Sequence, residues 1–501
     1  MGAKLAFFSD FCNTFATILF FCSMLFNSLS FVIFYPLVTL LYFLLPHRYR
    51  WQWLLLMSSV FYMAFVPLYI LILLFTIGID YIAGILIESA QGRQRKWYLG
   101  ASLVANIGIL AFFKYYNFGI SNLNWVLQYL NFDPLPLLHI VLPIGLSFHT
   151  FQAMSYTIEV YRGHQKAERH LGIYALYVLF YPQLVAGPIE RPQNLLPQFR
   201  AVHPYNNARL YEGLSQMLWG FFKKMVIADR LAVYVSYIFD SPFHYHPINI
   251  IIASFFFTIQ IYCDFSGYSD IAIGAARTMG FDLMQNFKQP YFSTNIQTFW
   301  QRWHISLSTW FRDYLYISLG GNRVRRWKIY RNVAIVFLVS GLWHGANWNY
   351  IVWGMLQGFW IILYMLYNDF CPYSLPDGRW WRGLYICCTF IGIVFSWIFF
   401  RANSLDDAWQ IFHNLLTWQT DGYALLLAIK DARQIEFGTL SYLIAGFSIA
   451  ILLAVDYFQP SHSVLLFPQK PLLQLLWNII LLVLIFTLGV FYQQSFIYFQ
   501  F

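Results

Sequence analysis

The chain has 501 residues, of which 59% are hydrophobic and only 11% are charged, and its formal net charge is +9. A soluble domain usually carries about 25% charged residues, so this composition excludes an ordinary water-soluble protein. The basic residues gather in short groups beside apolar runs, which indicates the cytoplasmic loops of a membrane protein rather than a nucleic-acid-binding surface. These groups are residues 47–50, 93–96, 223–224 and 323–331.

Residues 1–23 are an interrupted apolar stretch that starts near Lys4. They have the character of a weak signal segment, but no small-residue cleavage site follows them. A misassigned start upstream of Met24 is the alternative. We therefore expect an N-terminal extension over 1–23 and a single membrane domain over 24–501.

The rest of the chain alternates between apolar runs and short polar segments. A helix that crosses a bilayer needs about 20 mostly apolar residues. On this basis we expect an all-α protein with about eleven crossings. The runs are 29–45, 53–79, 99–116, 171–186, 210–228, 248–263, 333–343, 348–367, 383–400, 440–458 and 474–492. Within 402–439, the start at Ser404 and the helical spacing of Trp409, Phe412 and Leu416 predict a helix that lies on the membrane surface.

His304 lies within 294–321, a segment that predicts one helix because it starts with capping-box spacing and ends at two adjacent glycines. Desolvation on an apolar helix face disfavours the imidazolium, so we expect a neutral ring that can act as a general base. A core histidine satisfied by a backbone carbonyl is the alternative, although ionisable groups at bilayer depth are usually functional. The residues that would share this face with His304 are Trp300, Leu307, Phe311 and Leu315.

His344 lies inside a second long apolar segment, 332–367. One continuous helix of that length would measure about 54 Å, against a hydrocarbon core of about 30 Å, so the helix must break. Glycines at 341 and 345 and the amide of Asn347 place the break around His344. Non-helical backbone at membrane depth requires surrounding protein or a watery cavity, so we expect His344 to line a cavity. A histidine in a surface loop is the alternative.

The absence of several common motifs limits the reactions that the chain could catalyse. It has no Gly-x-Ser-x-Gly elbow, no Walker loop and no His-Glu-x-x-His helix. Its six cysteines form no Cys-x-x-Cys pair, so we expect neither a zinc site nor a disulfide framework. We also expect no metal and no bound cofactor. A neutral base beside an oxyanion site suits acyl transfer from a thioester to a hydroxyl. From these residues alone, a proton-coupled transporter remains nearly as plausible.

Two motifs carry a resemblance to a known family. Residues 297–308 read QTFWQRWHISLS and are followed by WFRDYLY at 310–316, and residues 340–346 read SGLWHGA. Together they resemble the two hallmarks of the membrane-bound O-acyltransferases. Gln301 departs from the pattern, where arginine is common. Further similarity is found at 185–189, 262–270 and 496–501, and the resemblance extends from Met24 to the end.

Within that family the chain is most similar to the bacterial branch that acetylates exported polysaccharides. The resemblance implies a helical fold with re-entrant and interfacial helices around a central tunnel, in which His344 is catalytic and His304 is its partner. It also implies a cytosolic thioester donor, acetyl-CoA, and an acceptor such as alginate, reached directly or through a periplasmic relay protein. The expected location is the bacterial inner membrane, where the partners are membrane lipid, the polysaccharide, and the relay or another polysaccharide-modifying protein.

Several residues beside the two histidines are candidates for substrate binding or support. The pair Arg312 and Asp313 could orient a ligand, although pairing within the protein is the favoured interpretation. Asp264 and Asp270 are expected to hold packed helices together. The remaining candidates are Trp300, Trp303, Trp343 and Asn347. The competing functions are transfer of D-alanine or another acyl group to a cell-envelope polymer, and polysaccharide transport.

Overall fold

In the computed structural model, the regular secondary structure of the described residues is all helical, as the sequence predicted. The described residues are 24–184, 187–242, 245–371, 376–417, 437–459, 470–491 and 496–497. The proposed extension 1–23 lies outside them. So do residues 185–186 and 498–501, which belong to the similar segments 185–189 and 496–501. The chain divides into two compact units, one of 1–217 with 268–284 and the other of 218–267 with 285–501. The division falls within α11 (Asn207–Phe221) and α13 (Pro247–Thr278).

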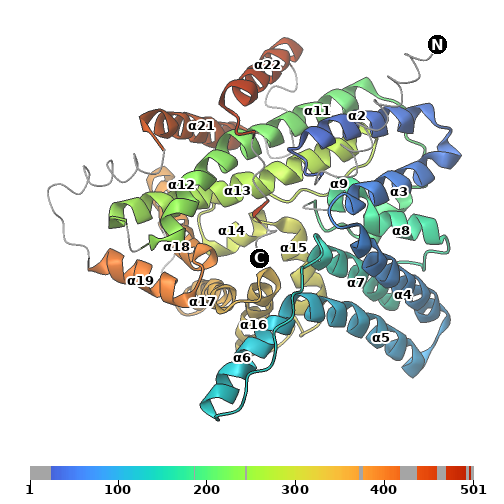
Figure 1. Cartoon of the computed structure of the whole chain (residues 1–501), viewed down its shortest axis with the longest axis horizontal. Helices are drawn as coiled ribbons and strands as arrows, with labels where there is room; N and C mark the ends of the chain where they lie inside the picture. The colour runs from blue at the N-terminus through green and yellow to red at the C-terminus, as the bar shows by residue number, and fades with distance from the viewer. Residues whose placement is uncertain are drawn as a thin grey trace. The chain divides into compact units, whose positions relative to one another are not determined.

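The first unit contains a bundle of helices in which α4, α5 and α7 pack against one another (Figure 1). Polar contacts hold this packing together. Asp80 of α4 accepts hydrogen bonds from Ser102 Oγ at 2.6 Å and from Asn106 Nδ2 at 2.9 Å, both on α5. The helices of this unit are α2 (Leu29–Leu44), α3 (His47–Met63), α4 (Ile70–Ser89), α5 (Gly92–Leu110), α6 (Tyr116–Tyr129), α7 (Leu146–Arg162), α8 (Leu171–Leu179), α9 (Tyr181–Leu184) and α10 (Pro192–Gln198). Within a membrane, helix association has no hydrophobic driving force, so hydrogen bonds between polar side chains help to hold helices together.

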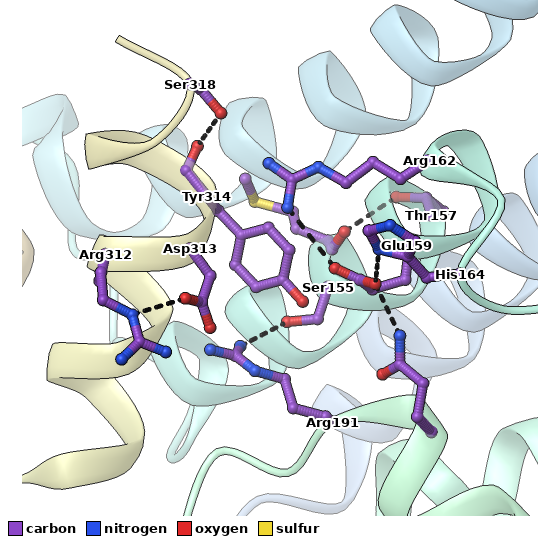
Figure 2. A network of polar contacts seen from close by, with 12 residues as sticks. Ser155, Thr157, Glu159, Arg162, His164, Arg191, Arg312, Asp313, Tyr314 and Ser318 are labelled. Atoms are coloured by element: carbon purple, nitrogen blue, oxygen red, sulfur yellow. Dashed lines mark hydrogen bonds and ion pairs between the residues drawn. The ribbon is translucent and has the colours of Figure 1, made fainter. Parts of the chain in front are cut away.

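A second polar centre in the same unit surrounds Glu159, near the end of α7 (Figure 2). Its Oε2 atom lies 3.0 Å from His164 Nδ1 and accepts a 2.6 Å hydrogen bond from Gln193 Nε2. Arg162 lies one turn away, with Nη1 3.6 Å from Oε1. The carboxylate is buried, and these neighbours compensate its charge.

The second unit contains the segments that carry both histidine motifs. Its most extensive helix pair is the antiparallel hairpin of α16 and α17 (Figure 1). The helices of this unit are α12 (Asp229–Asp240), α14 (Ile296–Arg302), α15 (Ile305–Trp310), α16 (Arg326–His344), α17 (Trp348–Phe370), α18 (Arg379–Arg401), α19 (Leu405–Leu416), α21 (Thr439–Phe458) and α22 (Pro471–Leu488). As predicted, α19 starts after Ser404, whose Oγ accepts a 3.0 Å hydrogen bond from the Asp407 N–H. The rest of the predicted surface segment, from 418 to 436, lies outside the described residues.

Among the described residues, seven helices are long and apolar enough to cross a membrane. They are Pro67–Ser89, Gly92–Tyr129, Pro247–Thr278, Trp348–Phe370, Arg379–Arg401, Thr439–Phe458 and Pro471–Leu488. The chain is therefore a multi-pass membrane protein. The other predicted crossings fall in helices that are shorter or more polar. The run 171–186 is divided between α8 and α9, and Leu29–Leu44 is apolar but has only 16 residues.

Candidate active site

The structure breaks the first histidine motif at His304, so the prediction of one helix over 294–321 was wrong. The helix α14 ends at Arg302, and α15 begins at Ile305. Between them His304 adopts a left-handed backbone conformation with φ of +43°. The cap of α14 is Asn295 rather than Thr294, because Asn295 Oδ1 accepts the Thr298 N–H at 2.8 Å. The apolar face that a continuous helix would have given His304 therefore does not form.

The break is held by a segment that lies about 20 residues earlier in the chain. The carbonyl of Asn286 accepts the Ile305 N–H at 2.8 Å, and its Oδ1 accepts a 2.6 Å hydrogen bond from Ser306 Oγ. Lys288 donates its N–H to the carbonyl of Arg302 at 2.9 Å. These bonds satisfy both helix ends at the break, which offsets the roughly 1–3 kcal/mol that such a backbone conformation costs.

The imidazole of His304 is almost fully buried among aromatic rings, with 1% of the residue exposed. Its centroid lies 4.5 Å from that of Phe265 at an interplanar angle of 89°, and 6.3 Å from that of Trp343. This burial lowers the pKa of His304, because an aromatic surrounding cannot solvate the imidazolium. The ring is therefore neutral at physiological pH.

The second motif contains the break that the sequence predicted. Helix α16 ends at His344, and α17 begins at Trp348. Asn347 caps α17, and its Oδ1 accepts the Asn349 N–H at 3.2 Å. Gly345 is required here because a Cβ atom would lie 2.2 Å from the ring of Tyr350. The glycine after the histidine thus lets the chain turn against α17.

Two further glycines bring the backbones of α16 and α17 together and so fix the position of His344. A Cβ atom on Gly341 would lie 2.3 Å from the carbonyl oxygen of Tyr350. A Cβ atom on Gly354 would lie 2.3 Å from the carbonyl oxygen of Phe337. Small residues permit such close helix packing in membrane proteins. The histidine is thereby carried at the end of a closely packed helical hairpin.

The ring of His344 is also enclosed by aromatic side chains, and 4% of the residue is exposed. Its centroid lies 4.9 Å from Trp343, 5.0 Å from Trp353 and 5.4 Å from Phe400. Trp343 is therefore the shared neighbour of both histidines. The two imidazoles, 40 positions apart in sequence, lie in one buried aromatic cluster, which we call the histidine cluster. It comprises Phe265, His304, Trp343, His344, Trp353 and Phe400.

Two other predicted residues extend this cluster. Trp300 Nε1 donates to Gln357 Oε1 at 3.2 Å, and its ring lies 5.8 Å from Trp353. The ring of Trp303 lies 5.2 Å from that of Trp397, which stacks on Trp353 at 5.5 Å. Trp300 and Trp303 of the first motif thus pack against tryptophans of α17 and α18, respectively.

Arg312 and Asp313 are placed differently. They lie in a π-helical turn at Phe311–Tyr316, and Arg312 Nε donates to Asp313 Oδ1 at 2.8 Å (Figure 2). The side chains are 61% and 28% exposed, respectively. This hydrogen bond joins the two predicted residues to each other, in a partly solvated position.

A buried ion cluster beside Phe265 was missed from the sequence. Lys224 Nζ lies 2.7 Å from both Asp229 Oδ1 and Asp264 Oδ1, and all three side chains are at most 4% exposed. Asp264 Oδ2 also accepts the N–H of Ile497 at 2.8 Å, near the end of the chain. The interpretation of Lys223–Lys224 as part of a basic loop was therefore wrong, because both lysines are buried in the π-helical segment Phe222–Ala228. Asp264 holds packed segments together, as expected, but its lysine partner lies 40 residues away.

The sequence of this chain matches a family model and several known proteins. The model of the membrane-bound O-acyltransferase family matches residues 146–405. A probable alginate O-acetylase of Azotobacter vinelandii is 41% identical over 397 residues, which cover 78% of this chain and 77% of that protein. Its counterpart in Pseudomonas aeruginosa is 39% identical over 434 residues, covering 85% and 81%. A peptidoglycan O-acetyltransferase of Helicobacter pylori is 34% identical over 414 residues, covering 76% of each. The chain therefore belongs to the membrane-bound O-acyltransferase family and is an O-acetyltransferase.

Proposed function

We propose that this protein transfers an acetyl group from a cytosolic thioester, acetyl-CoA, to a hydroxyl of an exported polysaccharide, alginate or a similar polymer. The acceptor is reached directly or through a periplasmic relay protein, and the enzyme lies in the bacterial inner membrane. The observation that supports this most is the histidine cluster, which joins both motif histidines around Trp343. The names of the alginate O-acetylase relatives support the choice of polymer.

In the proposed reaction His344 is the general base. Its imidazole takes the proton of the acceptor hydroxyl as the hydroxyl oxygen bonds to the acetyl carbonyl carbon. The carbon–sulfur bond then breaks, and the leaving thiolate receives the proton. This role requires that the imidazole be unprotonated before it acts. His304 assists by orienting the reactants or by binding the donor.

The supporting residues have positioning roles in this proposal. Asn347 fixes the backbone that follows His344 through its cap on α17. Trp343 packs against both imidazoles, and Trp300 and Trp303 restrict the space available to water. Excluding water limits hydrolysis of the thioester and strengthens electrostatic interactions with the reacting atoms.

The test is the acetate content of the secreted polymer in a strain that carries His344→Ala. Loss of a general base usually costs 10²–10⁴-fold, so we expect acetylation to fall at least about 100-fold while the protein remains inserted at its normal level. His413→Ala, at an exposed histidine near the end of α19, is the matched control and should leave acetylation unchanged. Normal acetylation by a stably inserted His344→Ala variant would exclude His344 as the base.

The alternative acceptor that a comparison favours is peptidoglycan, because one relative bears that name. The same strains separate the two acceptors. Acetate should disappear from the secreted polysaccharide and not from the cell wall if the proposal is right, and the reverse result would assign the peptidoglycan.

A further inference from the structure

An open groove of about 340 Å³ lies in the second unit, on two of the helices that can cross the membrane. Trp360 and Tyr364 of α17 form one wall, and Tyr385 and Thr389 of α18 form the other. Residues 294–296, at the start of α14, close one side. The volume is in the range of small-molecule sites, and neither His304 nor His344 lines the groove.

Charge identifies the side of the membrane at which the groove ends. Arg326, at the start of α16, forms an ion pair with Asp369, at the end of α17, so these two helix ends lie together. Five of the nine residues in 323–331 are basic, and α18 begins just beyond with Arg379 and Arg382. The excess of lysine and arginine in short loops marks the cytoplasmic side.

Two arginines do not line the groove themselves but lie close to residues that do. Arg382 precedes Tyr385 by one helical turn and continues the α18 face that lines the groove. Arg302 Nη1 donates to the carbonyl of Phe292 at 3.4 Å, two residues before Thr294. Burial lowers the pKa of Arg302, and the charge of Arg382 lowers it further. Within the described part of the chain, neither forms an ion pair with a carboxylate.

We propose that this groove binds an anionic glycerophospholipid of the cytoplasmic leaflet. One acyl chain lies against the aromatic walls of α17 and α18, and the phosphate lies against Arg382 and Arg302. Basic pockets between membrane helices on the cytoplasmic side suit anionic headgroups, and the tyrosines present hydroxyls at the level where headgroup and hydrocarbon meet. The proposal is independent of acetyl transfer, because it concerns a separate surface of the same unit.

The test measures lipid retained by the purified full-length protein after delipidation in detergent, by native mass spectrometry. The probes are phosphatidylglycerol and phosphatidylcholine with identical acyl chains. Wild type should retain more phosphatidylglycerol, and Arg382→Gln should reduce that preference about fivefold, the effect of one arginine near an anionic headgroup. Arg379→Gln is the matched control, because residue 379 lies about 120° around the helix from Tyr385.

A second variant tests the acyl-chain site. Thr389→Trp fills the groove and should reduce retention of both lipids. The proposal is overturned if wild type retains the two lipids equally, if Arg382→Gln and Arg379→Gln behave alike, or if an inserted Thr389→Trp variant retains both lipids as wild type does. If Thr389→Trp fails to insert, Arg382→Gln still tests the proposal, because Arg382 is exposed and its substitution should not prevent insertion.

Discussion

The histidine cluster and the ion cluster lie next to each other in the second unit, yet they handle buried ionisable groups in opposite ways. Asp264 and Phe265 are consecutive residues on α13. The side chain of Asp264 contacts Lys224, whereas that of Phe265 packs against His304. In the ion cluster, one cation is held between two carboxylates. In the histidine cluster, aromatic rings surround each imidazole, and burial lowers the pKa of His304.

The difference teaches that burial alone does not identify a catalytic group. A buried lysine between carboxylates compensates their charge, and removing the lysine leaves both carboxylates uncompensated. A buried neutral imidazole can accept a proton and release it again. We therefore propose a structural role for the cluster of Lys224, Asp229 and Asp264, and a chemical role for the histidines.

The largest expected effect on stability is at Lys224. Lys224→Met leaves Asp229 and Asp264 facing each other without a cation, and breaking a buried ion pair in this way costs about 3–5 kcal/mol. Thermal unfolding of the purified protein in detergent measures this change. Lys96→Met, at an exposed lysine, should change the unfolding temperature little. Equal unfolding temperatures for the two variants would contradict the structural role of the ion cluster.

The second prediction concerns pH and His304. Burial holds the pKa of His304 in the folded protein below its ordinary value of 6.5, so the unfolded chain binds a proton that the folded chain rejects. Its contribution to stability is therefore fully present above pH 6.5 and is lost as the pH falls, by at most about 1.4 kcal/mol per pH unit. His304→Gln should flatten the decline in stability below pH 6.5, whereas His413→Gln should not. Unfolding curves for His304→Gln that stay parallel to those of wild type across this range would show that His304 is not the group involved.

A smaller effect is expected from the cap that follows His344. Asn347→Ala removes the side-chain acceptor at the start of α17 and should cost about 1 kcal/mol of stability. Ser404→Ala removes the corresponding cap of α19 and should cost about the same. Only Asn347→Ala should also reduce acetyl transfer, because only its helix start adjoins His344. Equal acetyl transfer by both variants would limit Asn347 to capping.

These comparisons also show what could be predicted from the sequence. The break at His344 was predicted because its cause is local: glycines at 341 and 345 and a capping amide at 347 lie within a few residues. The left-handed conformation of His304 was not predicted, because Asn286 holds it from about 20 residues upstream. The burial of Lys224 was missed for the same reason, since its partner Asp264 lies on another helix. Local patterns predicted helices and breaks, whereas contacts between distant segments determined which polar groups are buried.

The smallest effect on stability is expected at Arg312 and Asp313. Variants of this pair test whether the candidate site extends beyond the aromatic rings. An exposed ion pair is worth about 0–1 kcal/mol, so Arg312→Gln, Asp313→Asn and the double variant should all unfold close to wild type. If the pair is purely structural, all three should also acetylate the polymer normally. If the pair orients a ligand, each single variant should lose acetyl transfer without losing stability, and the double variant should lose no more than the worse single one, because a ligand-binding pair acts as a unit. That outcome would place a charged ligand contact in the first histidine motif, outside the histidine cluster, and would add an ionised pair to a site that otherwise relies on neutral rings.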